Sequence, residues 1–146
     1  MFVSRSMTRR VITVGPEKTV FEAQDLMAAN GIRHLPVIDA SRQLIGIVTD
    51  RDIRSAVPYH FIRDSCSPEQ RDQICALTVK DIMTKDPISI SPTYTIQDAL
   101  LMIQNSRVGA LPVVDDDGKL SGILSVRDLL RAFINVLGIG EPGTLL

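Results

Sequence analysis

Two short motifs contain the side chains of this sequence whose types and spacing could bind a ligand. They are Thr49-Asp50-Arg51-Asp52 and Ser125-Val126-Arg127-Asp128. A hydroxyl three residues before an acid is typical of a helix N-terminus, where the two side chains cap free backbone N–H groups. The same carboxylate could accept two hydrogen bonds from the diol of a ribose, with a phosphate near the helix N-terminus. The spacing alone leaves both roles open.

An internal repeat relates the two motifs. Val3–Ile53 aligns with Val79–Leu129 without a gap, and 16 of the 51 aligned positions are identical. Identical residues fall at structural corners as well as in apolar runs, and they include Met7-Thr8 with Met83-Thr84, Leu35-Pro36-Val37 with Leu111-Pro112-Val113, and Gly46 with Gly122. Such a repeat indicates two copies of one structural unit.

The apolar pattern predicts β-α-β-β-α in each copy. A β-rich run at Val11–Val14 precedes an amphipathic helix at Val20–Ala29, which Thr19 and Glu22 cap. Two strands follow, joined by a polar turn, and a second helix begins near Asp50. The strands of the first copy are His34–Asp39 and Leu44–Thr49, and the matching elements of the second copy are Ile88–Ile90, Ile96–Asn105, Ala110–Asp115, Leu120–Ser125 and a helix from Val126 to Leu137.

These elements predict a mixed α+β (α/β) fold. A three-stranded sheet cannot close its own core, so we expect the two βαββα copies to pack face to face as a pseudo-two-fold pair. The predicted divisions are repeat 1 at 3–60, a helical connector at 61–78, repeat 2 at 79–137 and a C-terminal tail or linker at 138–146. Ser67-Pro68-Glu69-Gln70 predicts the start of the connector helix, with Cys75 buried on it.

Composition argues against several classes of protein. The 16 basic and 17 acidic residues nearly balance, so no nucleic-acid or anionic membrane partner is expected. No apolar run approaches the roughly 20 residues that span a bilayer, and we expect a cytoplasmic protein. Two cysteines outside a C-x-x-C pattern and two histidines predict no metal site. The sequence has no clustered nucleophile and base and no Gly-rich phosphate loop, so we do not expect an enzyme.

The repeated segments resemble a known family, the tandem cystathionine β-synthase (CBS) domain or Bateman module. The resemblance rests on Val79-Lys80-Asp81-Ile82-Met83-Thr84, on the segment Gly31 to Asp39, and on the segment Leu44 to Asp52. It implies a regulatory module that binds AMP, ADP, ATP or S-adenosylmethionine in clefts between the two repeats. In that family the bound ligand changes the conformation of an attached enzyme or transporter, and the module needs no cofactor of its own.

The same resemblance implies roles for particular residues. Asp52 and Asp128 would bind the ribose hydroxyls, Thr49 and Ser125 would lie beside ribose and phosphate, and main-chain groups of Thr13, Val14, Ser89 and Ile90 would contact adenine. Arg33 and His34 match the family's basic phosphate position, and Arg51 and Arg127 are second candidates. The second repeat has Gly109 and Ala110 instead of Arg33 and His34. Because Asp50 adds a negative charge beside Asp52, we expect Asp128 to contribute most to affinity.

Two further expectations concern partners. The apolar helices Ile53–Val57 and Leu129–Leu137 predict a symmetric homodimer. A structural dimerisation module without a ligand is the alternative function. The tail from Leu137 to Thr144 is similar to the link of acetoin-utilization proteins, in which an ACT-type domain follows the paired module. This likeness implies that the chain is the regulatory part of a longer protein.

Overall fold

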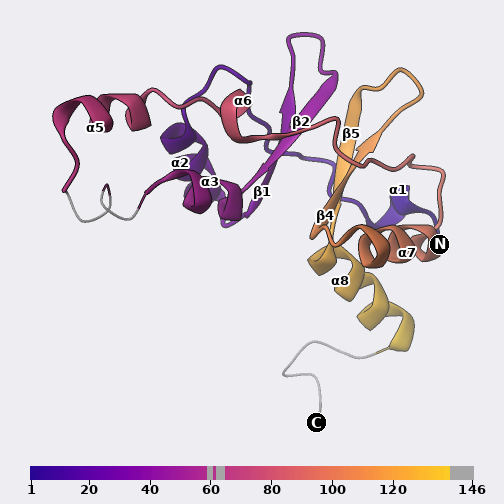
Figure 1. The fold of residues 1–146 in the computed structure, drawn as a ribbon. Coiled ribbons are helices and arrows are strands. Elements are labelled where there is room, and N and C mark those ends of the chain that lie inside the picture. The colour runs from indigo at the N-terminus through magenta and orange to yellow at the C-terminus, as the bar shows by residue number, and fades with distance from the viewer. Residues whose placement is uncertain (59–60, 62–64, 139–146) are drawn as a thin grey trace. The chain divides into compact units, whose positions relative to one another are not determined.

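The computed structural model describes residues 1–58, 61 and 65–138. The chain forms two compact units, each treated separately below (Figure 1). Ile12–Pro87 forms one, called the β1–β2 unit. Met1–Val11 and the described residues from Ile88 to Gly138 form the other, called the β4–β5 unit. Of the tail predicted at 138–146, residues 139–146 lie outside the described residues.

The β1–β2 unit is a hairpin with helices packed against it. Helix α2 (Val20–Asn30) precedes strands β1 (His34–Ile38) and β2 (Leu44–Thr49), which pair antiparallel with His34 opposite Thr49. Helix α3 (Asp50–Ala56) begins directly after β2. The later elements of this unit are α5 (Pro68–Cys75), α6 (Val79–Ile82) and β3 (Thr84–Lys85).

The β4–β5 unit repeats this arrangement. Helix α7 (Ile96–Ser106) precedes strands β4 (Ala110–Val114) and β5 (Leu120–Ser125), which pair with Ala110 opposite Ser125. Helix α8 (Val126–Leu137) follows β5, and α1 (Val3–Ser6) contacts it. The two long helices α2 and α7 end at the same place in the repeat, where Gly31 and Arg107 both adopt the left-handed conformation.

The predicted helices and hairpins are confirmed, but the first strand of each repeat is not. Val11–Val14 and Ile88–Ile90 form no strand, and each contributes a single parallel bridge, Val14 to Val37 and Ile90 to Val113. Pro16 and Pro92 follow within two residues and have no N–H to extend the pairing. The expected three-stranded sheets are therefore a hairpin with one flanking bridge, and β3 adds a third strand in the β1–β2 unit.

The segment that opens each repeat packs in the unit of the other repeat. Met1–Val11 belongs to the β4–β5 unit, where Thr8 bridges Ile123, and β3 pairs with β2 through Thr84 and Ile47 in the other. Glycine permits this close approach, since a Cβ on Gly122 would lie 2.9 Å from the Thr8 carbonyl oxygen. Gly46 faces Met83 and Thr84 in the same way. The ungapped repeat gave no sign of this exchange.

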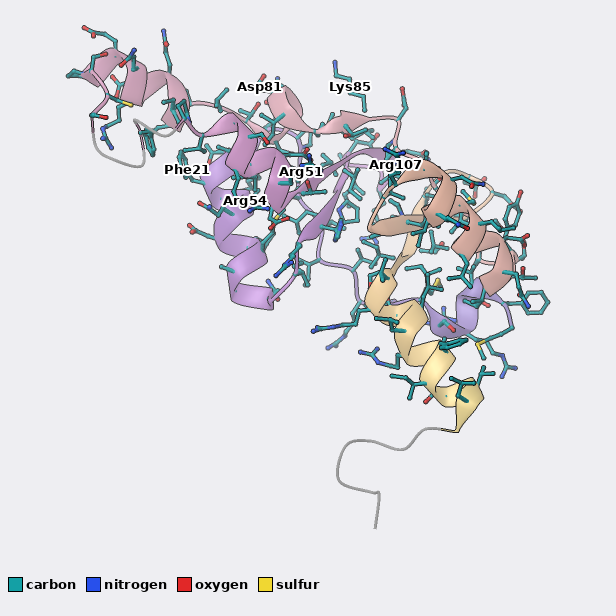
Figure 2. The ribbon with its side chains drawn as sticks, turned by 60° about the horizontal axis from the view of Figure 1, so that its bottom comes forward. Phe21, Arg51, Arg54, Asp81, Lys85 and Arg107 are labelled. Atoms are coloured by element: carbon teal, nitrogen blue, oxygen red, sulfur yellow. The ribbon has the colours of Figure 1, made fainter. Side chains whose placement is uncertain are left out.

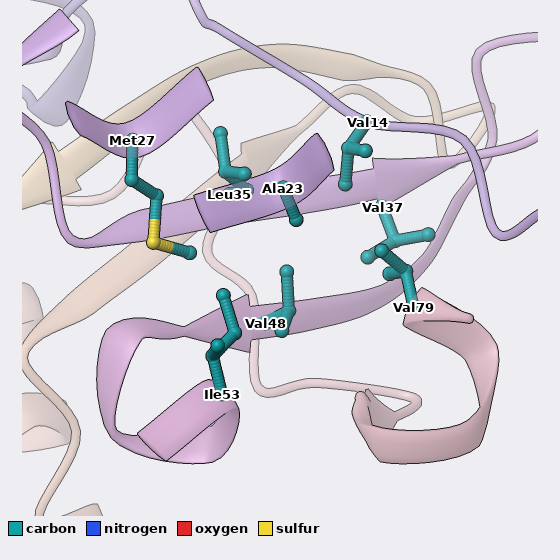
Figure 3. Packing of buried hydrophobic residues seen from close by; sticks show 8 residues of the cluster. All are labelled: Val14, Ala23, Met27, Leu35, Val37, Val48, Ile53 and Val79. Atoms are coloured by element: carbon teal, nitrogen blue, oxygen red, sulfur yellow. The ribbon is translucent and has the colours of Figure 1, made fainter. Parts of the chain in front are cut away.

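Each unit has its own apolar core. In the β1–β2 unit, Leu35 and Val37 from β1 lie with Val48 from β2 and Ile53 from α3 (Figure 3). Val79 from α6 is fully buried in the same cluster, and burial of such a side chain stabilises by roughly 1.5–3 kcal/mol. The equivalent residue Val3 is fully buried in the other unit. The exchanged segments are therefore anchored by apolar burial.

The connector helix is confirmed, with one correction. Helix α5 begins after Ser67, whose hydroxyl accepts a hydrogen bond from Gln70 N while Gln70 returns one to Ser67 N. Cys75 was predicted to be buried on this helix, but it is exposed. Ile74 is the residue that the helix buries, because only one narrow face of this polar helix meets the core.

Candidate functional site

Thr49 and Asp52 form a reciprocal cap at the junction of β2 and α3. Asp52 N donates to Thr49 Oγ1 at 3.1 Å, and Thr49 N donates to Asp52 Oδ2 at 2.9 Å. Asp52 Oδ1 and the Thr49 hydroxyl proton take part in no hydrogen bond with any residue that the structure describes. The capping role is therefore real, and it leaves one carboxylate oxygen and one hydroxyl proton for a ligand.

Ser125 and Asp128 form the equivalent cap at the junction of β5 and α8, but it is more crowded. Asp128 Oδ2 accepts from Ser125 N at 2.9 Å and from Ser125 Oγ at 3.0 Å. Asp128 Oδ1 accepts from Thr8 Oγ1 at 3.1 Å and lies 3.7 Å from Arg131 Nη1. Asp128 is only 6% exposed. Its carboxylate is thus surrounded by donors from its own chain.

The basic residues of the first repeat lie at the start of β1. Arg33 is exposed, and its carbonyl accepts a hydrogen bond from Asp50 N at 3.1 Å, which joins the start of β1 to the start of α3. His34 is partly buried, and burial lowers its pKa below the ordinary value of 6.5. Asp50 opposes this pKa shift and Arg33 adds to it. His34 can therefore offer a neutral imidazole close to the Thr49–Asp52 cap.

Asp50 forms an ion pair within its own helix. Its carboxylate lies 3.5 Å from Arg54 Nη2, one turn along α3. This partly exposed pair reduces the negative charge that Asp50 was expected to bring against a phosphate. Arg51 and Arg127, the second candidates for phosphate, are both exposed at the starts of their helices, as Figure 2 shows for Arg51 on α3.

The main-chain groups expected to contact adenine are not all free. Val14 N donates to Pro36 O and its carbonyl accepts from Ile38 N, and Ile90 makes the same two bonds with Pro112 and Val114. Neither Thr13 nor Ser89 forms a backbone hydrogen bond with a described residue. Of these four residues, only Thr13 and Ser89 therefore keep both main-chain groups out of backbone pairing within the described chain.

Sequence reasoning missed Thr8. It recorded the identical pairs Met7-Thr8 and Met83-Thr84 but assigned no role to them, because the hydrogen bond from Thr8 to Asp128 spans 120 residues. The described part of the chain holds no group of three or more His, Cys, Asp or Glu side chains that could bind a metal ion. None of its helices has the length and apolarity to cross a membrane.

Part of a known enzyme is similar in sequence to this chain. An inosine-5'-monophosphate dehydrogenase from Korarchaeum cryptofilum is 41% identical over 121 residues, which are 83% of this chain and 22% of the dehydrogenase. The chain therefore spans about a fifth of the length of the dehydrogenases that it matches.

Two crystal structures match nearly the whole chain. CBSX2 of Arabidopsis thaliana, in complex with AMP, is 30% identical with a TM-score of 0.79, covering 93% of this chain and 98% of that one. An acetoin utilization protein (AcuB) from Vibrio cholerae is also 30% identical, with a TM-score of 0.78 and coverages of 97% and 98%. The family model of the CBS domain matches residues 3–59 and 79–135, and the chain belongs to the CBS domain family.

Proposed function

We propose that this chain is a regulatory module that binds an adenosyl ligand, with AMP, ADP, ATP and S-adenosylmethionine as candidates, and catalyses no reaction itself. The observation that carries the proposal is the Thr49–Asp52 cap, which keeps a carboxylate oxygen and a hydroxyl proton unused. A ribose diol donates to such an oxygen, and a phosphate accepts from such a hydroxyl. The AMP complex of CBSX2, a relative that aligns along 98% of its length, supports the choice of ligand.

Arg33 and His34 are the proposed phosphate contacts. An arginine guanidinium offers a charged, planar fork of N–H donors that suits a phosphate. His34 lies between Arg33 and the first buried residue of β1, and its ring is near enough to Asp50 and Asp52 for both acids to raise its pKa against the effect of burial. The second repeat has no side chain of this kind at Gly109 and Ala110. The proposed phosphate position is therefore specific to the first repeat.

We also propose that two chains associate through the apolar face of α7 and α8. Leu130 and Phe133 are 57% and 60% exposed, which is unusual for large apolar side chains. With their neighbours they line a hollow of about 650 Å³, formed by Met1, Ile96, Leu100, Ile103, Val126, Leu129, Leu130, Ala132, Phe133 and Val136 together with the polar Gln97. A twofold dimer would cover this face with its own copy. Light scattering should report about twice the chain mass of 16.1 kDa.

Titration calorimetry with AMP tests the ligand proposal, after a thermal-shift panel of AMP, ADP, ATP, S-adenosylmethionine and NAD. A ligand at 100 times its dissociation constant should stabilise the protein by roughly 2.7 kcal/mol. Asp52→Asn and Asp128→Asn each preserve shape while removing a charged acceptor. Losing charge-assisted bonds of roughly 1.5–3 kcal/mol should weaken binding at the affected pocket by at least about tenfold.

The same variants decide between ligand binding and capping. If the wild-type protein binds no member of the panel, or if both variants bind like the wild type and merely melt earlier, the motifs are caps only. The structural dimerisation module would then be the better description of the chain.

A further inference from the structure

Asp52 and Asp128 differ at the carboxylate oxygen that does not take part in the backbone cap. In both motifs Oδ2 accepts the backbone N–H three residues earlier at 2.9 Å, so the two caps are alike there. Asp52 Oδ1 has no hydrogen bond or ion pair within the described structure. Asp128 Oδ1 accepts a hydrogen bond from the hydroxyl of Thr8 and forms an ion pair with Arg131. The oxygen that is open in the first repeat is occupied in the second.

The occupying hydroxyl comes from the exchanged N-terminal segment. Thr8 N donates to Ile123 O at 2.8 Å and Ile123 N donates to Thr8 O at 3.0 Å, so the backbone of Thr8 is fixed beside β5. Thr84 is the matching residue and pairs with Ile47 of β2 in the same register. No hydrogen bond joins the Thr84 hydroxyl to Asp52. The backbone arrangement is therefore shared, and only one threonine side chain engages its aspartate.

We propose that the Thr8 hydroxyl competes with the adenosyl ligand for Asp128, which couples the hold on the Met1–Val11 segment to occupancy of this site. The inference rests on the proposed function. A carboxylate offers about four lone-pair positions, and Ser125 N, Ser125 Oγ and Thr8 Oγ1 already take three of them, while Arg131 Nη1 lies 3.7 Å from Oδ1. A ribose diol needs two, so it reaches Oδ1 only when Thr8 withdraws.

The coupling works in both directions. A ligand that displaces Thr8 weakens the attachment of the N-terminal segment, and anything that strengthens that attachment lowers affinity at Asp128 by the same factor. The Asp52 pocket has no such competitor and should fill at the lower ligand concentration. This order is the reverse of the one expected from the sequence, where the extra charge of Asp50 favoured Asp128.

The experiment measures AMP binding in an Asp52→Asn background, so that the remaining affinity reports the Asp128 pocket. Adding Thr8→Val removes the competing hydroxyl and keeps the β-branched shape. Because a hydrogen bond to a charged group contributes substantially to binding free energy, the affinity of the Asp128 pocket for AMP should rise by roughly tenfold or more. Thr84→Val in the same background is the matched control and should leave the affinity unchanged.

Hydrogen exchange gives a second measurement that does not depend on a variant. In the wild-type protein, AMP at a concentration that fills the weaker site should speed exchange of the Thr8 amide, while the Thr84 amide is unaffected. The proposal is overturned if AMP binds the wild type but Thr8→Val and Thr84→Val give equal affinities, or if saturating AMP slows exchange at Thr8. Absence of AMP binding in the wild type would instead remove the proposed ligand function.

Discussion

The two units bury nearly the same residues and expose very different helix faces. Leu100, Val126 and Leu130 line the apolar hollow of the β4–β5 unit, while the repeat places Gln24, Asp50 and Arg54 at the same positions of the β1–β2 unit. Asp50 and Arg54 pair with each other across one turn of α3. The comparison teaches that the repeat preserves the core and the corners, and that the two units differ on the outer faces of the helices and at their N-termini.

The first repeat also covers part of its helix face with its own connector. Phe21 on α2 stacks on Phe61 with ring centroids 5.4 Å apart, and the guanidinium of Arg71 lies 4.8 Å from the Phe61 centroid. The residue that matches Phe21 in the second repeat is Gln97, beside the hollow. Part of one helix face is thus covered from within the chain, and the other face is apolar and exposed.

The largest expected effect concerns this difference. Leu100→Glu should dissociate the proposed dimer, because twofold symmetry places two unpaired carboxylates in an apolar interface, and we expect the dissociation constant to rise by roughly a hundredfold or more. Gln24→Glu is the same change of charge at the matching position of α2 and should leave the dimer intact. Sedimentation velocity over a range of concentrations measures both. Equal behaviour of the two variants, or a monomeric wild type, would show that the open face is not the interface.

Much of each unit could be predicted from sequence because its signals are local. The caps Thr19–Glu22, Thr49–Asp52 and Ser125–Asp128 lie within one turn, and two apolar runs joined by a polar turn mark β1 and β2. The exchange of the opening segments depends on contacts such as Thr8 with Ile123, which no local pattern encodes. The left-handed Arg107 is similarly hidden, since Gly31 fills that corner in the other repeat and an arginine gives no turn signal.

The candidate site was predictable in its residue types and not in its state of occupancy. Spacing and resemblance indicate Asp52 and Asp128 as equivalents, but only the structure distinguishes the open oxygen of one from the engaged oxygen of the other. The charge of Asp50 looked decisive in the sequence. The structure adds Arg54 beside it, which weakens that argument.

A smaller effect should follow from moving the phosphate contact between the repeats. Arg33→Ala should lower the affinity for AMP by about tenfold and the affinity for adenosine hardly at all, because the lost charge-assisted contact is specific to phosphate. Gly109→Arg places the same side chain at the matching position of the second repeat. Gly109 is exposed and is not among the glycines with positive φ, so the backbone should accept arginine. This variant should raise the affinity of the second pocket for AMP more than its affinity for adenosine.

Calorimetry with the two ligands measures both changes. The comparison fails if Arg33→Ala weakens adenosine as much as AMP, because Arg33 would then contact the nucleoside or support the fold. It also fails if Gly109→Arg leaves the ratio of AMP to adenosine affinity unchanged in an Asp52→Asn background, where only the second pocket remains.

The smallest expected effect is the pH dependence that His34 gives to the first repeat, where the second has Ala110. Burial lowers the pKa of His34 from 6.5, with Asp50 raising it, Arg33 lowering it and Asp52 raising it in decreasing order. The unfolded chain therefore binds a proton at a higher pH than the folded chain does. Its stability contribution is complete above about pH 6.5 and declines as the pH falls toward the lower pKa of the folded state. His34→Gln, which keeps a polar side chain of similar reach, should reduce this decline.

Melting temperatures between pH 7.5 and pH 5 measure the contribution of His34 separately from that of the carboxylates. Asp81 and Asp98 also have lowered pKa values, through hydrogen bonds from the backbone of Thr78 and Thr95, but they titrate below 3.8 and so outside this range. Over this interval the wild type should lose more stability than His34→Gln. The difference in unfolding free energy should be smaller than the changes in binding free energy expected for the dimer and phosphate-contact variants. Parallel curves for the two proteins would mean that His34 is as well solvated in the folded chain as in the unfolded one, and the argument for a neutral imidazole beside Asp52 would fall.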